Sequence, residues 1–571
     1  MKLPHLLQFL HPSRKPLVWK IAGISLALAL LFFLLFALST LGEINDLGIR
    51  KLTGFPGGNN YLLVFQNDAE RRPTGGFITA YGILKFRFGI PFISFGNVYD
   101  PKLIQPGEVS PDPTIASLLA GDFFPGNGFR DGNYSPDFPT SAQELMRLYH
   151  LGYPDTNFDG VIAVDFTAFE NLAKVVAPEV LGETGLFSAI ETKVQDIDLH
   201  NPDELAERKN FLGDLAKYLI RKIITSPGKY SLAAESIVSS LDSKHLQMYF
   251  TDSEMESRAK TKAWDGSLPT VASGDLLAVV EGNYGGMKSS RYLIRDVDYS
   301  VEVADSENGL QPTAHLKISL KHWGDAAEPI SGYYKGFFRV YAPLGAELIS
   351  GKIDRFYDDG LHSVYEKIIQ MNPGEEREIN LTYTLPESVI VGDTYKLKIV
   401  KQAGSSDDRI RAIVKLPHGY LTSSSEFEAR ENLAFFQTDI MHNKDLALKI
   451  IPDTLPPRLA WQEFVGGLTT IDLRFNEALD ADSVSKATFA ITDANYRNSA
   501  TDNVVIEKVK FIPPQDIRLT VSGVSEVCRE WYKLDFSGVA DKHGNILNNQ
   551  KITIVEWLNS AGEICDKERK L

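Results

Sequence analysis

The segment that joins the first two predicted strands holds residue types suited to binding an anion. Residues 66–77 read Gln-Asn-Asp-Ala-Glu-Arg-Arg-Pro-Thr-Gly-Gly-Phe. Arg72 can contact a phosphate or carboxylate through two parallel hydrogen bonds, with Glu70 placed to orient it. The alternative, equally compatible with these residue types, is a structural turn in which Arg72 pairs with Glu70. The residues whose backbone amides would face an anion are Thr74, Gly75 and Gly76.

A second polar segment, residues 129–139, precedes a predicted helix and contains Arg130, Asp131 and Asp137. Long polar loops on α/β scaffolds commonly handle ligands. The alternative is a loop rich in Asp and Asn that satisfies its own backbone. A third segment, residues 281–291, is weaker because its Gly-Gly-x-Lys lacks the spacing of a phosphate-binding loop.

We predict that Arg72 and Arg130 approach one another across a single cleft. Both lie in loops beside predicted strands, and both precede turn-forming residues. Two arginines without an acid between them repel, so such a site would need an anion. If each guanidinium is instead locked to a carboxylate, the motif is structural.

Residues 21–42 contain no charged side chain and are long enough to cross a bilayer as a helix. Four basic residues and no acid precede this run, whereas Glu43 and Asp46 follow it, which places the N-terminus in the cytoplasm. A cleaved signal peptide is the alternative, with its best cleavage site near Ser39. The length of the run favours a single-pass, type II signal anchor with an extracytoplasmic body.

The composition excludes some functions and leaves others open. The chain of 571 residues carries a formal charge of −15, or about −19 without the four basic residues that precede the anchor. An acidic body without a basic patch is not expected to bind nucleic acid. Cys528 and Cys565 are the only cysteines, and we predict that they pair. They lack the spacing of a zinc site, so no metal site is expected from the residues alone.

Strand and helix signals alternate over residues 61–295, which predicts an α/β or α+β domain. A continuous apolar run at 61–66 indicates a strand covered on both faces. Capping boxes at Ser141 and Thr167 predict the starts of two helices. An amphipathic pattern predicts a longer helix over residues 203–224.

Short alternating runs separated by turn residues predict two further domains. Residues 296–450 are expected to form an antiparallel β-sandwich. Residues 453–557 resemble bacterial Ig-like domains of the S-layer type, including the turn Asp541-x-x-Gly544-Asn545. The whole division is a cytoplasmic tail 1–20, an anchor 21–42, a linker 43–60, these three domains and a C-terminal tail 558–571.

Several blocks together resemble the bacterial domain of unknown function 4012 family. The pattern Asn-x-x-Glu-x-Arg-x-Thr-Gly-Gly-Phe matches residues 67–77, and further blocks match residues 130–139 and 159–162. Segments at 282–288 and 339–345 extend the resemblance to about residue 415. The resemblance implies little about activity, because the family is largely uncharacterised.

The order of elements is also remotely similar to the LytR–CpsA–Psr family, whose members transfer polyprenyl-linked glycopolymers in the cell envelope. That similarity implies arginines on a diphosphate, with Arg72 in the motif position, and acidic residues on a divalent metal. The chain departs from the family's Arg-Ser-Asp-Thr motif, because Pro73 and Thr74 follow Arg72 and the Asp of the motif is absent.

Two functions therefore compete. The first is an envelope protein that binds or transfers polyprenyl-phosphate-linked glycans, with cell-wall glycan or lipid-linked glycopolymer as its partner. The second is a non-catalytic surface or adhesion protein that uses its β-domains. The residues do not decide whether the chain is an enzyme.

Overall fold

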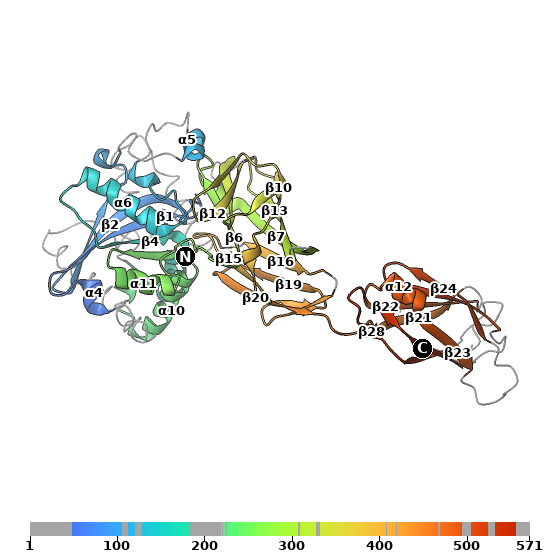
Figure 1. Ribbon diagram of the computed structural model, residues 1–571. Helices are drawn as coiled ribbons and strands as arrows, with labels where there is room; N and C mark the ends of the chain where they lie inside the picture. Colours follow the sequence, from blue (N-terminus) through green and yellow to red (C-terminus); the bar gives the residue numbers. More distant parts are fainter. Residues whose placement is uncertain are drawn as a thin grey trace.

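The structure is a computed structural model of a multidomain, mostly β protein (Figure 1). An α/β domain adjoins a long β-sandwich, and a smaller β-sandwich follows at the C-terminal end. The residues that it describes are 48–104, 112–119, 128–181, 218–219, 221–223, 225–306, 309–326, 332–406, 408–417, 419–465, 469–493, 504–523 and 531–555.

Several predictions fall outside these residues. They are the anchor at 21–42, the pairing of Cys528 with Cys565, most of the helix at 203–224 and the tail at 558–571. Within the described part of the chain, no helix has the length and apolarity that a membrane crossing requires. Part of the expected linker is folded: residues 49–53 form a short helix, α4 (Ile49–Thr53), whose Leu52 is buried.

The α/β domain is built on a five-stranded sheet in the order β3-β2-β1-β4-β5. The central strands β1 and β4 are parallel, and the other neighbours are antiparallel. The apolar run at residues 61–66 predicts β1, and the structure confirms this strand. The bounds of the five strands are β1 (Asn60–Asn67), β2 (Phe77–Arg87), β3 (Ile90–Gly96), β4 (Gly160–Asp165) and β5 (Leu246–Phe250).

Helices cover both faces of this sheet, which explains the unbroken apolar run of β1. Leu62 and Val64 pack on one face with α6 (Phe138–Gly152). Tyr61, Leu63 and Phe65 pack on the other face with the remaining larger helices. These helices are α7 (Phe166–Val176), α10 (Tyr230–Asp242) and α11 (Ser253–Thr261).

Shorter helical segments occur in the connections of the two domains. They are η1 (Pro101–Leu103), α5 (Pro113–Leu119), η2 (Phe129–Asp131), η3 (Pro178–Val180), η4 (Pro227–Lys229), η5 (Ser289–Tyr292) and η7 (Glu387–Val389).

The predicted capping residues are wrong by a few positions. Helix α6 begins after Asp137, whose carboxylate accepts the Thr140 N–H, and Pro139 follows in the first turn. Helix α7 begins after Asp165, which accepts the Ala168 N–H. An aspartate before the first helical residue satisfies an unpaired N–H just as Ser or Thr does. Both caps therefore come from aspartates rather than from the expected Ser141 and Thr167.

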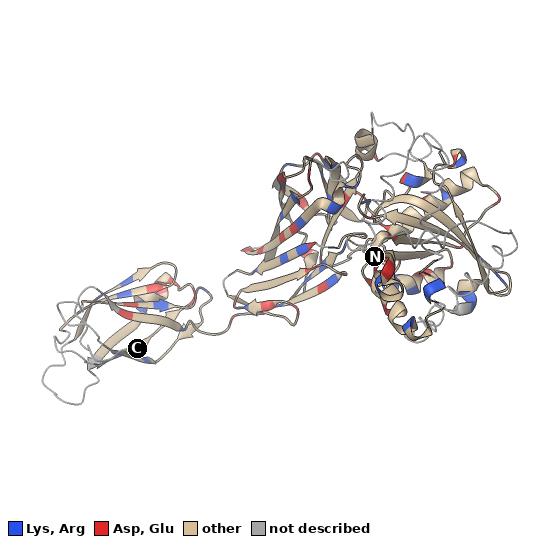
Figure 2. Cartoon of the chain, turned by 180° about the vertical axis from the view of Figure 1, so that it is seen from behind, with Lys and Arg blue, Asp and Glu red and all other residues tan. Residues whose placement is uncertain are grey.

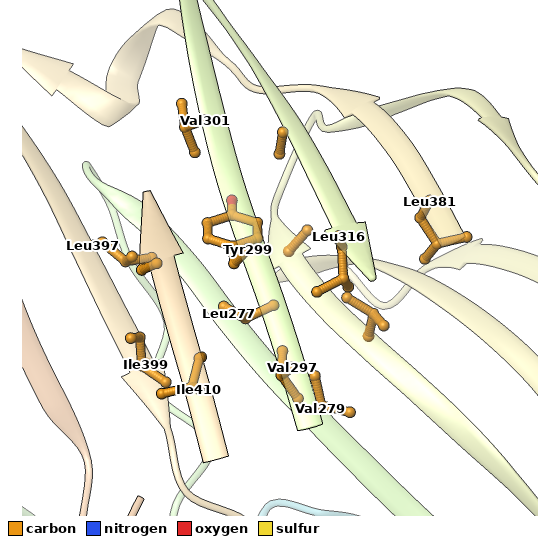
Figure 3. Close-up of a cluster of buried hydrophobic side chains, with 14 of the residues drawn as sticks. Leu277, Val279, Val297, Tyr299, Val301, Leu316, Leu381, Leu397, Ile399 and Ile410 are labelled. Atoms are coloured by element: carbon orange, nitrogen blue, oxygen red, sulfur yellow. The ribbon is translucent and has the colours of Figure 1, made fainter. Parts of the chain in front are cut away.

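The long sandwich packs two sheets around one apolar core (Figure 3). One sheet contains β11 (Arg355–Asp358), β12 (His362–Met371), β9 (Tyr334–Pro343), β6 (Asp275–Asn283), β15 (Thr394–Val400), β20 (Lys444–Pro452) and β17 (Tyr420–Ser423), with β14 (Ile390–Val391) on β15. The other contains β10 (Glu347–Gly351), β13 (Glu376–Thr384), β8 (Gly309–His322), β7 (Leu293–Ser306), β16 (Arg409–Lys415), β19 (Leu433–Asp439) and β18 (Glu428–Arg430).

Two features of this sandwich differ from the expectation. Strand β6 was placed in the α/β domain, but it pairs with β9 and β15, so the sandwich begins before the expected boundary at 296. The sheets are also not purely antiparallel, because β6 runs parallel to β15 and β7 runs parallel to β16. Acidic and basic residues are interspersed along the strands of the sandwich (Figure 2), and some pair between neighbouring strands, as Arg411 of β16 does with Asp298 of β7.

The C-terminal sandwich has a four-stranded and a three-stranded sheet around a separate core. The four-stranded sheet contains β21 (Leu459–Val465), β22 (Thr470–Phe475), β25 (Asp516–Ser522) and β24 (Val505–Ile512). The three-stranded sheet contains β23 (Thr488–Asp493), β26 (Trp531–Ser537) and β29 (Gln550–Val555). Helix α12 (Ala481–Lys486) and the strands β27 (Val539–Ala540) and β28 (Ile546–Leu547) complete it. The S-layer-type resemblance stays a prediction.

The turn between β27 and β28 contains Asp541, Gly544 and Asn545. Gly544 has a positive φ of 84°, but Asn545 does not share it. The Asn545 side chain instead donates to the Asp541 carboxylate and to the Asp453 carbonyl in the connection from the long sandwich. Burial, with Asp453 and Asp541 nearby, raises the pKa of Glu477 to about 7.

Candidate functional site

The loop that contains Arg72 leaves the sheet at the carboxyl ends of the parallel strands β1 and β4. Ligands of α/β proteins usually bind at this edge. The loop also forms the boundary with the long sandwich: Thr74 bridges to Ala403 in parallel, and the Asn283 N–H donates to the Arg71 carbonyl at 2.9 Å. Gln247 donates to the Thr74 carbonyl at 2.8 Å from the opposite side. Both domains therefore fix the position of the loop.

Arg72 is buried, with 3% of its surface exposed, yet its hydrogen bonds are incomplete. Its Nη2 lies 3.1 Å from Glu70 Oε1 and 3.7 Å from Asp131 Oδ1. The guanidinium carbon lies 3.9 Å from the centre of the Tyr284 ring. Nε and Nη1 have no hydrogen-bond partner among the described residues. This side chain thus presents two unsatisfied N–H donor groups inside the protein.

Arg130 joins the same group of side chains. Its Nε lies 3.3 Å from Asp131 Oδ2, and its guanidinium carbon lies 6.0 Å from the Phe77 ring centre. Arg72 contacts the same ring at 5.3 Å and the same carboxylate. The structure therefore brings the two arginines together. Contrary to the expectation of an acid-free pair, Asp131 lies between them. Each guanidinium thus contacts a carboxylate, which is the arrangement expected of a structural motif, and it is the two unpartnered donor groups of Arg72 that favour a ligand.

The charges of this group, which we call the arginine cluster (Glu70, Arg72, Arg130, Asp131 and Lys288), favour an anion. Burial raises the pKa of Glu70 to about 7, although Arg72 opposes the shift. The charges of Lys288 and Arg130 also act on Glu70. Near neutral pH Glu70 is therefore partly protonated, so the three cations of the cluster outnumber its carboxylate charges. An anionic ligand would balance the remaining positive charge.

The other predicted site residues support the fold rather than face the cluster. The buried Thr74 hydroxyl accepts a hydrogen bond from Gln66 at 3.2 Å. The Gly75 N–H donates to the Arg72 carbonyl, so it is not open to an anion. A Cβ at Gly76 would lie 2.3 Å from the Asn67 carbonyl carbon, which explains the glycine. Asp137 caps α6 and accepts the Leu268 N–H at 3.0 Å.

Sequence reasoning missed the role of the neighbouring Arg71. Its Nη1 lies 2.6 Å from Glu281 Oε2, and its Nε donates to the Gly404 carbonyl at 3.3 Å. Glu281 is completely buried and also accepts the Ser290 hydroxyl at 2.6 Å. This ion pair joins the loop to β6 of the sandwich. The position of Glu281 in the third polar segment was the available signal.

A second missed group, Asp68, Asp165 and His245, lies at the same sheet edge. Their candidate ligand atoms lie within 4.8 Å of one another. Asp165 Oδ2 lies 2.6 Å from His245 Nδ1, and its Oδ1 accepts the Ala168 N–H at 2.9 Å. Thr167 donates to Asp68, whose pKa is raised to about 6 by burial and by the charge of Asp165.

The transferase similarity implies a divalent metal, and these three residues are its candidate ligands. Two carboxylates and an imidazole are a possible donor set for a transition metal. However, Thr167 donates to Asp68, and Ala168 and His245 contact both oxygens of Asp165. The aspartate of the family motif is also absent, because Pro73 and Thr74 follow Arg72. The three residues therefore fit a polar group that satisfies its own hydrogen bonds better than they fit a magnesium site.

The fold and the cluster define a multidomain β-rich protein with an α/β domain and a candidate anion site. Residues 56–191 match the model of a family described as "Protein of unknown function (DUF4012)". The predicted resemblance to this family is thus confirmed over residues 56–191. The extension to residue 415 and the LytR–CpsA–Psr similarity stay predictions.

The other comparisons add no function. No curated protein matches the chain. A Legionella pneumophila protein whose description suggests nutrient binding is 10% identical, with a TM-score of 0.22 over 32% of this chain and 73% of its own. A Listeria innocua protein is 11% identical, with a TM-score of 0.19 over 36% of this chain and 79% of its own.

Proposed function

We propose that this chain is a bacterial cell-envelope protein that binds a polyprenyl-phosphate-linked glycan, with the phosphate groups at the arginine cluster. In this proposal residues 21–42 anchor the chain in the membrane and the body lies outside the cytoplasm. A phosphate-bearing lipid then presents its charged group next to the surface on which the body is held.

The observation that carries the proposal is the pair of unsatisfied N–H groups on Arg72. A buried donor without an acceptor costs about 1–3 kcal/mol. A protein retains such a group where a ligand supplies the acceptor. Guanidinium N–H groups donate charge-assisted hydrogen bonds to phosphate oxygens, and both Nε and Nη1 of Arg72 are without an acceptor among the described residues. Arg130 and Lys288 add positive charge nearby.

Native mass spectrometry of the full-length protein extracted from its own membrane tests the proposal. We expect the wild-type protein to carry a co-purified polyprenyl phosphate. Arg72→Ala should lose about 1–3 kcal/mol of binding free energy, the range for charged hydrogen bonds, or roughly ten- to a hundredfold in affinity. Equal lipid occupancy in wild type and Arg72→Ala would contradict the proposal and favour the non-catalytic surface protein.

Arg147→Ala is the matched control for this experiment. Arg147 lies in the same domain, is 43% exposed at its side chain and pairs with Glu144 at 2.7 Å. The substitution Arg147→Ala therefore removes the same charge from the protein as Arg72→Ala does, but it leaves the arginine cluster unchanged. Its lipid occupancy should equal that of the wild type, and a loss there would show that binding follows net charge alone.

The proposed topology has a separate test. A reporter that is active only outside the cytoplasm, fused after Leu571, should be active, and protease added to spheroplasts should degrade the body. A protected body would contradict the topology. A mature protein that starts near Ser39 would show that the apolar segment is a cleaved signal peptide.

A further inference from the structure

A large groove lies between the α/β domain and the long sandwich, away from the arginine cluster. Its volume is about 960 Å³, which is at the upper end for ligand pockets. The start of α6, the segment after α11 and the strands β9, β11 and β12 contribute its lining. We propose that this groove binds a neutral oligosaccharide. The inference rests on the proposed function in one respect, because it supplies the site for the glycan part of that ligand.

The charge of the lining argues for a neutral ligand. Five carboxylates and four lysine or arginine side chains line the groove, so its formal charge is about −1 with the histidines neutral. A polyanion or a polycation would meet similar numbers of attractive and repulsive charges there. A ligand with many hydroxyl groups, in contrast, can donate to the carboxylates and accept from the cations. The serine and threonine hydroxyls of the lining add further partners.

Aromatic rings give the groove apolar surfaces of the size of a sugar ring. Tyr134 and Tyr357 line it and are partly exposed, and the buried Tyr341 lies beside Tyr357. The Arg355 guanidinium carbon lies 4.2 Å from the Tyr357 ring centre and so supports that ring. Tyrosine combines an apolar face with a hydroxyl group, which suits the C–H face and the hydroxyls of a sugar.

Buried hydrogen bonds hold the walls of the groove in place. His362 is 2% exposed, and its ring nitrogens lie 3.1 Å from Asp359 Oδ2 and 3.1 Å from the Pro269 carbonyl. It thereby joins β12 to the segment after α11. Asp137 joins that segment to α6 through the Leu268 N–H. A site held rigid before binding loses less entropy when a ligand enters.

The groove is connected to the arginine cluster by a column of stacked side chains. Arg72 lies 3.9 Å from the Tyr284 ring centre, and Tyr284 stacks on Phe337 with ring centres 5.8 Å apart. The Arg339 guanidinium carbon lies 4.1 Å from the Phe337 ring centre. Arg339 lines the groove. A single ligand can therefore place its phosphate at the arginine cluster and its sugars in the groove.

The test uses full-length protein in a detergent without a sugar headgroup, since a maltoside would compete for the groove. The probes are neutral tetrasaccharides of glucose, galactose, mannose or N-acetylglucosamine, measured by isothermal titration calorimetry. At least one neutral tetrasaccharide should bind. Tyr357→Ala should weaken that binding at least fivefold, or about 1 kcal/mol, whereas Tyr357→Phe should retain most of it.

Tyr333→Ala is the matched control, because Tyr333 is 43% exposed in the same domain and does not line the groove. Its tetrasaccharide affinity should equal that of the wild type. Binding of none of the neutral tetrasaccharides, equal binding by Tyr357→Ala, or preference for a uronic acid tetrasaccharide would each overturn the inference. Capture of an extended peptide at the same site, with no sugar binding, would overturn it as well.

Two probes separate this inference from the proposed function. A tetrasaccharide has no phosphate, so its binding should survive Arg72→Ala and decline in Tyr357→Ala. Polyprenyl monophosphate has no sugar, so its binding should decline in Arg72→Ala and survive Tyr357→Ala. If the wild-type protein binds polyprenyl monophosphate but no tetrasaccharide, the inference about the groove is overturned and the proposed function stands. If it binds a tetrasaccharide but no polyprenyl monophosphate, the proposed function is overturned and the inference about the groove stands.

Discussion

Two adjacent arginines in one loop have opposite surroundings. Arg71 faces the sandwich, where Glu281, Gly404 and Ser290 complete a buried network. Arg72 faces the other side, where it touches Glu70 and Asp131 and leaves two N–H groups unsatisfied. Successive side chains of an extended segment point to opposite sides. The first arginine therefore joins two domains, and the second is available to a ligand.

The comparison shows that burial alone does not identify the function of an arginine. Both residues are at most 9% exposed, but only Arg71 has acceptors for its donors. Complete pairing is typical of structural ion pairs, whereas unsatisfied donors indicate a binding role. The loop needs the sandwich on one side in order to present Arg72 on the other, so the candidate site depends on both domains.

The largest effect on stability is expected from substitution of Arg71. Arg71→Ala leaves the buried Glu281 without its cation and should lower the free energy of unfolding by about 3–5 kcal/mol. Urea denaturation followed by fluorescence of the buried Trp264 measures this loss. The double variant Arg71→Met, Glu281→Gln should recover much of it, because neither buried charge remains. A loss below 1 kcal/mol in Arg71→Ala would refute the structural role.

A smaller effect is expected from Lys401, which is 1% exposed at the same boundary. Burial lowers its pKa to about 7, although Asp408 opposes the shift. The unfolded chain then binds more protons than the folded one between about pH 7 and pH 10, so stability should rise with pH in that window. Burial also lowers the pKa of Lys244 to about 8, which adds to the slope.

Lys401→Met isolates the contribution of this residue. The variant should be more stable than the wild type at pH 7, and its free energy of unfolding should rise less steeply up to pH 10. Denaturation series at several pH values measure both quantities. An unchanged slope would show that Lys401 keeps its ordinary pKa in the folded protein.

Much of the fold could be predicted because its signals are local. The apolar run of β1 and the turn residues of the sandwich correctly located strands. The sequence could not place β6, since its apolar run at residues 276–280 suits either domain. Only the pairing of β6 with β9 and β15 decides the question, and those strands are distant in sequence.

The candidate site could be predicted only in part. The composition of residues 66–77 correctly pointed to the loop and to Arg72. It could not distinguish the direction of Arg71 from that of Arg72, because the partners of Arg71 lie about 210 and 330 residues further along the chain. The group of Asp68, Asp165 and His245 was missed for the same reason, since His245 is 80 residues from Asp165.

The pH dependence of anion binding tests the role of Glu70 beside Arg72. Burial raises the pKa of Glu70 to about 7, so acidification from pH 8 to pH 6 should neutralise it and strengthen binding of an anion. A polyprenyl diphosphate sugar is a suitable probe, because its charge is constant in this range. Glu70→Gln should bind this probe at pH 8 as the wild type does at pH 6. A wild-type affinity that falls on acidification would contradict the prediction.

The smallest effect on stability is expected from Arg72→Met, although this change should abolish most phosphate binding. Methionine replaces a buried side chain whose Nε and Nη1 contribute no hydrogen bond, and it can still pack against Tyr284. Glu70, which loses its cation, readily takes up a proton because its pKa is already raised. The free energy of unfolding should therefore change by less than about 1 kcal/mol, well below the range for a broken buried ion pair. Urea denaturation of Arg72→Met beside Arg71→Ala measures the contrast directly. A loss as large as that of Arg71→Ala would show that both arginines are structural, and the phosphate site would have to be sought elsewhere.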